Sequence, residues 1–337
     1  MKGTDSLRRG ILFLVIAVLA VLLILSPFLL SSYLIHILIL IFIWSAITTA
    51  WSYMGRFGLV SFGHGSILGI GAYTTALLFN YYGLSPWIGM FIATLMAVLF
   101  FTGLGYCCFR LGVAGHYFAI TTLVEAMVIN LLIINFRDFT GGSLGLTIYP
   151  LGTAPLFFQF ESKTYVYFIS LLFLLLTLYI WKKIDRSNAK RALIAIENDE
   201  VASSSIGIPI VKYKTVVTAI SAFLTSIGGI IYAQYMMILH PDAITGLHVA
   251  AIGVPFKAIL GGIFSLWGPL VGTALYTGLE EFFRVAYGTR FIGWSMAVFG
   301  VVFIILIIFL PRGLYGTLDQ IFQERKAFKA DKHSTIP

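Results

Sequence analysis

Charged residues are scarce in this sequence. Asp, Glu, Lys and Arg make up 11% of the 337 residues, whereas hydrophobic residues make up 59%. No hydrophilic stretch is long enough to fold as a separate domain, and a soluble domain does not have such a composition. The chain is therefore predicted to be an all-α polytopic membrane protein.

The sequence also lacks recognisable arrangements of the residues that usually carry out catalysis. The two cysteines, Cys107 and Cys108, are adjacent in an apolar run, which favours neither a disulfide framework nor a metal site. No nucleophile–base pair is visible, so an intramembrane enzyme is disfavoured, and no cofactor is expected. The phosphate-loop pattern G-x4-G-K-[ST] does not occur, so uphill transport by this chain would need energy from another polypeptide.

Long apolar runs dominate what is present. Ten of them have the length of a membrane span, and the first is interpreted as a retained span because it is longer than a signal-peptide core and no cleavage site follows it. The expected division is a tail and first span at 1–32, a transmembrane domain at 33–317 with a charged loop at 182–214, and a tail at 318–337. The ten runs are 11–30, 33–54, 59–79, 87–109, 116–136, 165–181, 213–236, 250–266, 269–287 and 291–310.

The distribution of positive charge predicts the orientation. The net charge is +8, but Lys and Arg gather at the chain ends and in alternate loops rather than in a nucleic-acid-binding patch. With the N-terminus in the cytoplasm, seventeen of the 22 fall inside, four fall outside and Lys257 lies within a span. Cytoplasmic loops of membrane proteins carry this excess, so both termini are predicted to be cytoplasmic.

Two segments, 55–74 and 261–277, are too rich in glycine for ordinary spans. Both contain G-x3-G-x3-Y-T, at Gly65, Gly69, Tyr73 and Thr74 and again at Gly268, Gly272, Tyr276 and Thr277. Each alone is typical of a close helix-packing face. Two copies in corresponding halves favour an internal repeat with broken helices along a substrate path.

Ionisable residues within spans are costly and need a reason. Glu125 and Lys257 both fall near mid-span, with Pro255 expected to kink the second of these spans. They line a path, or form an internal ion pair directly or through water, or one of them is neutral because its pKa is shifted. His64 and His36 are each more simply explained as hydrogen-bond partners between helices. The predicted path residues are Ser61, His64, Gly65, Gly69, Tyr73, Glu125, Lys257, Gly261 and Gly262.

Residues 182–214 form a charged stretch between two apolar runs. Within it, apolar and charged residues alternate so as to predict one short amphipathic helix over 188–203. Glu200, Ala202 and Gly207 then make an E-x-A-x4-G pattern. The segment is either a solvated cytoplasmic loop or a docking element for a soluble partner.

Six motifs in order resemble one family. They are SFGHGSILGIGAYTTALL (61–78), GHYFAITTL (115–123), TGGSLGL (140–146), RALIAIENDEVASSSIGI (191–208), ILGGIFSLWGPLVGTAL (259–275) and FLPRGLYG (309–316). Over roughly residues 40–316 the chain is similar to LivM-type permease subunits of branched-chain amino acid ABC importers.

The resemblance implies a place in the bacterial inner membrane and a set of partners. These are a second, LivH-like permease, two cytoplasmic ATPase subunits and an extracytoplasmic binding protein, besides membrane lipid. Residues 188–208 would dock on an ATPase through Arg191, Ala195, Glu197, Glu200, Ala202 and Gly207. The alternative is a secondary transporter driven by an ion gradient, with Glu125 and His64 carrying protons.

Several positions depart from the family pattern. Glu197 stands where Arg is usual and Ser203 where Ala is usual, while Glu125 and Lys257 replace apolar residues. An acidic residue is usual where Met127 stands. Because some of these changes fall in the expected path, the substrate stays open among branched-chain amino acids, urea, short amides and aromatic acids.

Overall fold

The computed structural model describes residue 18 and residues 21–287, 300–301, 304 and 313–317. Almost all of the ordered structure in these ranges is helical. The long helices are α2 (Ser32–Gly55), α3 (His64–Tyr82), α4 (Pro86–Arg110), α5 (Gly115–Asn135), α7 (Lys163–Asp185), α10 (Ile210–Met236) and α13 (Gly268–Tyr287). The all-α prediction is confirmed for this part of the chain.

Short elements join the long helices. They are α6 (Arg137–Thr140), α8 (Asn188–Asn198), α9 (Glu200–Ser205), α11 (Pro241–Ile244) and α12 (Gly253–Gly261), with 3-10 turns at Gly142–Leu144 and Pro155–Phe157. A π-helical turn, η3 (Leu247–Ile252), leads directly into α12. The two-residue strands β1 (Leu146–Thr147) and β2 (Ile238–Leu239) pair antiparallel, with Leu146 opposite Leu239.

Within the described ranges, five helices are long and apolar enough to cross a membrane by length and composition: α2, α4, α5, α7 and α10. The eighth predicted span, 250–266, is wrong. Its helix α12 ends at Gly261, because Gly262 has a φ of +107°, a conformation that favours glycine. The first predicted span, 11–30, is described only at residue 18 and residues 21–30, and the tenth lies largely outside the described residues.

Local sequence explains where the helices begin and end. Ser31 caps α2 by accepting a hydrogen bond from the backbone N–H of Leu34 at 3.4 Å. Pro86 opens α4, where a missing N–H costs nothing. Gly83 ends α3 with a φ of +63°.

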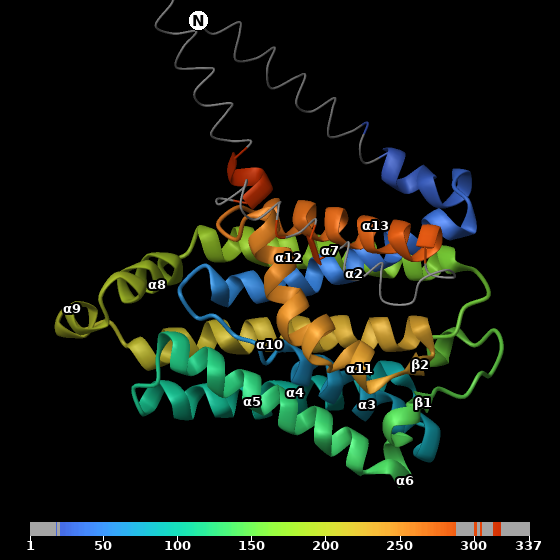
Figure 1. The fold of residues 1–337 in the computed structure, drawn as a ribbon, viewed down its shortest axis with the longest axis horizontal. Helices are drawn as coiled ribbons and strands as arrows, with labels where there is room; N and C mark the ends of the chain where they lie inside the picture. The colour runs from blue at the N-terminus through green and yellow to red at the C-terminus, as the bar shows by residue number, and fades with distance from the viewer. Residues whose placement is uncertain (1–17, 19–20, 288–299, 302–303, 305–312, 318–337) are drawn as a thin grey trace, which may run out of the picture.

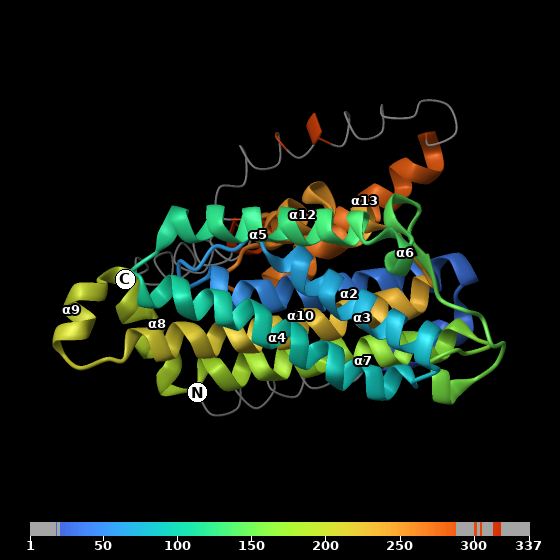
Figure 2. The same cartoon turned by 90° about the horizontal axis from the view of Figure 1, so that it is seen from below.

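The long helices lie side by side as an elongated bundle (Figure 1). At one end, α8 and α9 project beyond it. The opposite end carries α6, β1 and β2, and α12 crosses steeply between α13 and the layer of α10, α4 and α3. Figure 2, the view from below, shows α5 lying along one side of α4, with α10 and α7 farther from α5.

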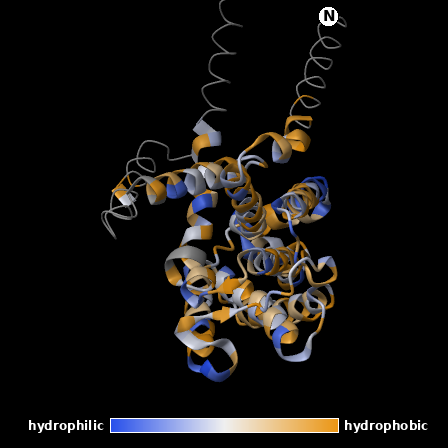
Figure 3. Cartoon of the chain, turned by 90° about the vertical axis from the view of Figure 1, so that its right-hand side faces the viewer, coloured by the Kyte–Doolittle hydropathy of each residue, from blue (hydrophilic) through white to orange (hydrophobic). Residues whose placement is uncertain are grey.

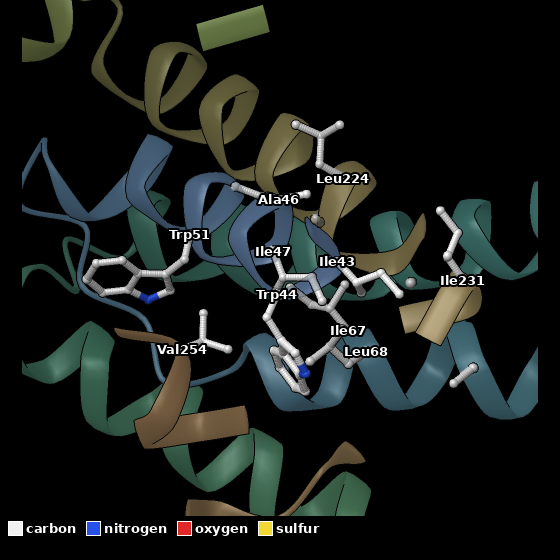
Figure 4. Close-up of a cluster of buried hydrophobic side chains, with 14 of the residues drawn as sticks. Ile43, Trp44, Ala46, Ile47, Trp51, Ile67, Leu68, Leu224, Ile231 and Val254 are labelled. Carbon is white, nitrogen blue, oxygen red and sulfur yellow. The ribbon is translucent and has the colours of Figure 1, made fainter. Parts of the chain in front are cut away.

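Helix α2 forms the centre of the bundle, since it packs against α7, α10, α12 and α13. Every residue from 42 to 55 is buried. Figure 4 shows Ile43, Ile47 and Trp51 of this helix lying among Ile67, Leu224, Val254 and their neighbours. A helix that is apolar on all sides is expected in such a position.

The outer surface is apolar as well. Large hydrophobic residues of α4, α5 and α7 are exposed, among them Phe91, Leu131 and Leu172, and apolar ribbon reaches the outside of the bundle in Figure 3. A soluble protein rarely exposes an apolar surface of this extent. These faces are suited to lipid.

Candidate translocation site and docking element

Ser61, His64 and Glu125 come together at the start of α3. The Ser61 carbonyl oxygen accepts from the Trp51 indole at 2.7 Å, and its hydroxyl accepts from the Gly63 N–H at 3.0 Å. The His64 Nε2 lies 2.9 Å from the hydroxyl of Ser221 on α10. This contact joins α3 to α10, as expected for a histidine that acts as a hydrogen-bond partner between helices.

Glu125 of α5 faces this loop. A Cβ atom on Gly63 would lie 2.7 Å from the Glu125 Oε2, 2.6 Å from the Phe101 ring and 3.2 Å from the Thr122 Cβ. Glycine at 63 thus leaves room for the carboxyl group. Phe101, Thr122 and Ser221 are members of this cluster that sequence reasoning missed, because nothing in a local pattern shows which residues of separate helices face one another.

Gly69 and Tyr73 lie farther along α3 and line a cavity of about 270 Å³. A Cβ atom on Gly69 would overlap the side chain of Thr245, so this glycine permits a close contact. The Tyr73 hydroxyl donates to the Leu239 carbonyl of β2 at 2.9 Å. The remaining lining comes from α3, α4, α5 and α6: Ile70, Thr74, Leu77, Met96, Phe100, Ile129, Leu132, Ile133, Phe136 and Thr140.

Lys257 lies in a different environment from Glu125. Its ammonium is 4.2 Å from the Trp44 ring centroid and 4.6 Å from that of Tyr276, with Glu280 acting on it electrostatically. Among the described residues no ion pair joins it to Glu125. The prediction of a direct pair is therefore wrong, because aromatic faces surround this cation instead.

Glycines hold α12 against α13. A Cβ atom on Gly272 would overlap the Lys257 carbonyl oxygen, and one on Gly261 would overlap the carbonyl of Gly268. Gly262 makes the turn that follows α12. The two G-x3-G-x3-Y-T copies occupy matching places, since Gly65 is the second residue of α3 and Gly268 the first of α13.

The segment predicted as one helix over 188–203 is two helices, α8 and α9. Asp199 separates them in an extended conformation (φ −158°, ψ 108°), and its carboxylate accepts from the Ala202 N–H at 2.9 Å. The single-helix prediction is therefore wrong at this residue. An Asp before a new helical turn is a typical N-cap, and this signal was present in the sequence.

Helix α8 buries one face against the bundle and exposes the other. Ala192, Leu193 and Ile196 are buried, whereas Arg191 and Glu197 are exposed and Ala195 is half-buried. Glu197 lies against Gly58, and the partial burial there raises the pKa of its carboxyl. An Arg at 197 would place a longer cation beside this loop.

Two ion pairs hold the projecting helices to the bundle. In the first, Lys190 of α8 lies 3.4 Å from Asp185 at the end of α7, and Asp185 is itself held by Arg56 at 2.6 Å. The Arg56 guanidinium also stacks on Trp181 at 3.8 Å. Burial lowers the pKa of Arg56, and the nearby Asp185 opposes that shift.

The second ion pair joins α9 to α10. Glu200 pairs with Lys214, whose ammonium lies 5.6 Å from the Phe109 ring of α4. Ala202 and Gly207 are exposed, and Gly207 ends the element with a φ of +83°. The Glu200 side chain predicted to act in docking thus also anchors α9.

Comparison with known proteins identifies the family. Residues 29–307 match the family described as the branched-chain amino acid transport system permease component. The chain belongs to this family. The resemblance to LivM-type permeases is confirmed by two curated relatives.

Both relatives carry the name high-affinity branched-chain amino acid transport system permease protein LivM. The Escherichia coli protein is 29% identical over 286 residues, and the Salmonella typhimurium protein is 28% identical over 285. Each alignment covers 77% of this permease and 64% of the relative, so the permease spans less than two thirds of their length. No solved structure matches it.

Family membership and the apolar helices together support a multi-pass protein of the bacterial inner membrane. Both relatives are named as permease proteins of a transport system.

Proposed function

We propose that this chain is a transmembrane permease subunit of an ABC importer. With a second, LivH-like permease it forms the path for branched-chain amino acids or a similar small polar solute. Two cytoplasmic ATPase subunits drive it, and an extracytoplasmic protein delivers the substrate. In this arrangement both termini and the α8–α9 end face the cytoplasm.

The observation that carries this proposal is the exposed face of α8 and α9. Val201 is 78% exposed and Ile206 77%, and Ile194 is exposed nearby. These apolar side chains stand among Arg191, Glu197 and Asp199 on an element that projects beyond the bundle. Apolar residues surrounded by charges are typical of a surface that a protein partner covers.

The contacts that hold α8 and α9 to the bundle explain how a movement of these helices would be transmitted to the path. Lys190 and Glu197 connect α8 to Asp185 and to the loop at Gly58, which continues to Ser61 and the start of α3. Glu200 connects α9 to α10, which carries the His64 partner Ser221. Movement of α8 and α9 would therefore displace both sides of the Glu125 cluster.

Replacing Val201 and Ile206 together with Asp tests the docking surface. We expect the ATPase subunits to be lost from the purified complex and ATP-driven uptake to fall by about tenfold or more, because the charges would be buried without partners. The measurement is co-purification and uptake after co-expression of the subunits. Leu151→Asp, at an exposed position in the loop before α7, is the matched control.

Normal co-purification and uptake in the double variant would refute the docking role. The alternative, a secondary transporter using Glu125 and His64, is favoured by the unpartnered Glu125 oxygens and His64 Nδ1. It predicts uptake by the purified chain alone, in vesicles that contain a proton gradient and no ATPase.

A further inference from the structure

Helices α4 and α5 diverge toward the end of the bundle that carries α6. Near the opposite end, the ring centroids of Phe109 on α4 and Phe118 on α5 lie 5.1 Å apart. Figure 2 shows the two helices spreading apart from there toward α6. The cavity of about 270 Å³ lies in this widening gap, between Met96 and Phe100 of α4 and residues of α5. Helix α3 packs on both helices and lines the inner side of the cavity.

The cavity opens onto the apolar outer surface of the bundle. Four of its lining residues are large, apolar and exposed: Met96, Phe100, Leu132 and Phe136. Farther in, Tyr73 of α3 is only 3% exposed. The surface around the opening consists of the faces of α4 and α5 that are suited to lipid. The cavity is therefore continuous with the surface that the membrane covers.

The cavity offers few polar atoms to a ligand. The Tyr73 hydroxyl donates to the Leu239 carbonyl at 2.9 Å, and the Thr140 hydroxyl donates to the Ile133 carbonyl at 2.5 Å. Thr74 is the remaining polar side chain of the lining. A polar solute would give up its hydrogen bonds to water here and gain little in return. The interior therefore suits a hydrocarbon chain.

The length of the cavity matches an acyl chain of one membrane leaflet. Its lining on α3 runs from Gly69 to Leu77, which at about 1.5 Å per residue is about 12 Å. The hydrocarbon core of a bilayer is about 30 Å thick, so each leaflet contributes about 15 Å. A chain that descends from a lipid headgroup can thus occupy the cavity along most of its length.

The rim near α6 lies at the depth of a headgroup. Tyr81 and Tyr82 end α3 and are exposed, and the Tyr81 hydroxyl donates to the Asp138 carbonyl of α6 at 3.1 Å. Exposed tyrosines at a helix end are typical of the membrane–water interface. Arg137 follows the lining residue Phe136, is exposed and has no ion pair among the described residues. Its guanidinium is suited to a phosphate.

We propose that a membrane phospholipid binds at this site, with one acyl chain in the cavity between α3, α4 and α5 and its phosphate at Arg137. The chain fills the space that α4 and α5 leave between them, and it supports the half of α5 that lies beyond Glu125. The site requires only that the protein is inserted in a bilayer. Its assignment to the outer leaflet rests on the orientation proposed above.

The test is photo-crosslinking of the purified full chain in phosphatidylethanolamine vesicles. The probe is phosphatidylglycerol with a diazirine midway along one acyl chain, which on illumination reacts with whatever lies beside it. Mass spectrometry of the peptides then locates the adducts. We expect adducts on α3 at Tyr73 and its neighbours in the lining, which lipid outside the bundle does not reach because Tyr73 is 3% exposed.

Two adjacent residues of α5 provide a variant and its matched control. Ile129 lines the cavity, so Ile129→Trp should lower the labelling of α3 by about fivefold or more, because an indole and an acyl chain cannot share one close-packed space. Val128 is exposed and outside the lining, so Val128→Trp should label as the unmodified chain does. If Ile129→Trp does not fold, Ile129→Phe replaces it, with a smaller loss expected.

A third variant tests the headgroup contact. Arg137→Gln should lower the labelling of α3 severalfold without a loss of folded protein, because the phosphate loses its cation while the cavity is unchanged. Labelling of α3 that is the same in Arg137→Gln as in the unmodified chain would refute the phosphate contact.

Three results would overturn the acyl-chain site. Adducts confined to exposed positions such as Leu131 would mean that lipid only surrounds the bundle. Undiminished labelling of α3 in Ile129→Trp would mean that the chain does not enter the cavity. Labelling that disappears when the second permease is co-expressed would assign the cavity to a helix of that partner. Since the measurement on the purified chain involves neither ATPase nor substrate, failure of the importer assignment would leave its result intact.

Discussion

Gly272→Ala is expected to destabilise the chain, whereas Gly278→Ala on the same helix is not. A methyl group at 272 would overlap the Lys257 carbonyl oxygen and the backbone of Gly261. Backbone atoms cannot move aside by changing rotamer, so α12 and α13 must separate. Overpacking of this kind typically costs about 1–3 kcal/mol, and clashes with backbone lie at the upper end.

Gly278 provides the control because nothing lies within 4 Å of a Cβ atom built there. Alanine favours a helix over glycine by about 1 kcal/mol, so Gly278→Ala should be neutral or slightly stabilising. Thermal unfolding in detergent measures both variants. Equal melting temperatures would show that α12 and α13 do not depend on this contact.

Larger side chains should have a larger effect. With Leu at both Gly69 and Gly272, two separate close contacts are lost, one to Thr245 and one to α12. We expect loss of monodisperse folded protein in size-exclusion chromatography. Ordinary assembly of that double variant would contradict the role of small residues in both contacts.

Asp185→Ala is expected to destabilise the chain more than Arg56→Met. The guanidinium of Arg56 is 4% exposed, so removal of Asp185 leaves a buried cation without its carboxylate. Asp185 itself is 31% exposed and retains Lys190 after Arg56 is removed. Removing one partner of a fully buried pair costs about 3–5 kcal/mol. Because this pair is partly exposed, Asp185→Ala should lower the free energy of unfolding by about 2 kcal/mol.

A double-mutant cycle separates the ion pair from the packing of Arg56 on Trp181. In the Arg56→Met background, Asp185→Ala should cost about 0.5 kcal/mol or less, because no buried cation is left unpaired and only the partly exposed pair with Lys190 is lost. Glu161→Ala is the exposed control. Additive effects of the two changes would mean that the two side chains act independently.

The sequence predicted the long helices well because their apolar runs are continuous. It also predicted that residues 55–74 and 261–277 are interrupted, and the structure places both glycine motifs at the start of a helix after a loop. The eighth predicted span was wrong because hydropathy alone does not register the break at Gly262. Side-chain composition shows that a segment is apolar but gives no backbone angles.

Contacts between helices were the least predictable part of the candidate site. Glu125 and Lys257 have similar depths in their predicted spans, which made them plausible partners. Depth does not define the direction in which a side chain points around the helix axis, and Lys257 faces Trp44 instead. Neither Phe101 beside Glu125 nor Trp181 beside Arg56 follows from a pattern within one segment.

The position of Lys257 over Trp44 gives this protein an optical reporter of its own. A positive charge 4.2 Å from an indole ring alters the electric field that the excited state experiences. Lys257 belongs to α12 and Trp44 to α2, so sliding of one helix past the other changes that field. Emission from Trp44, isolated by replacing the other five tryptophans of the sequence with Phe, would follow this sliding without an attached dye.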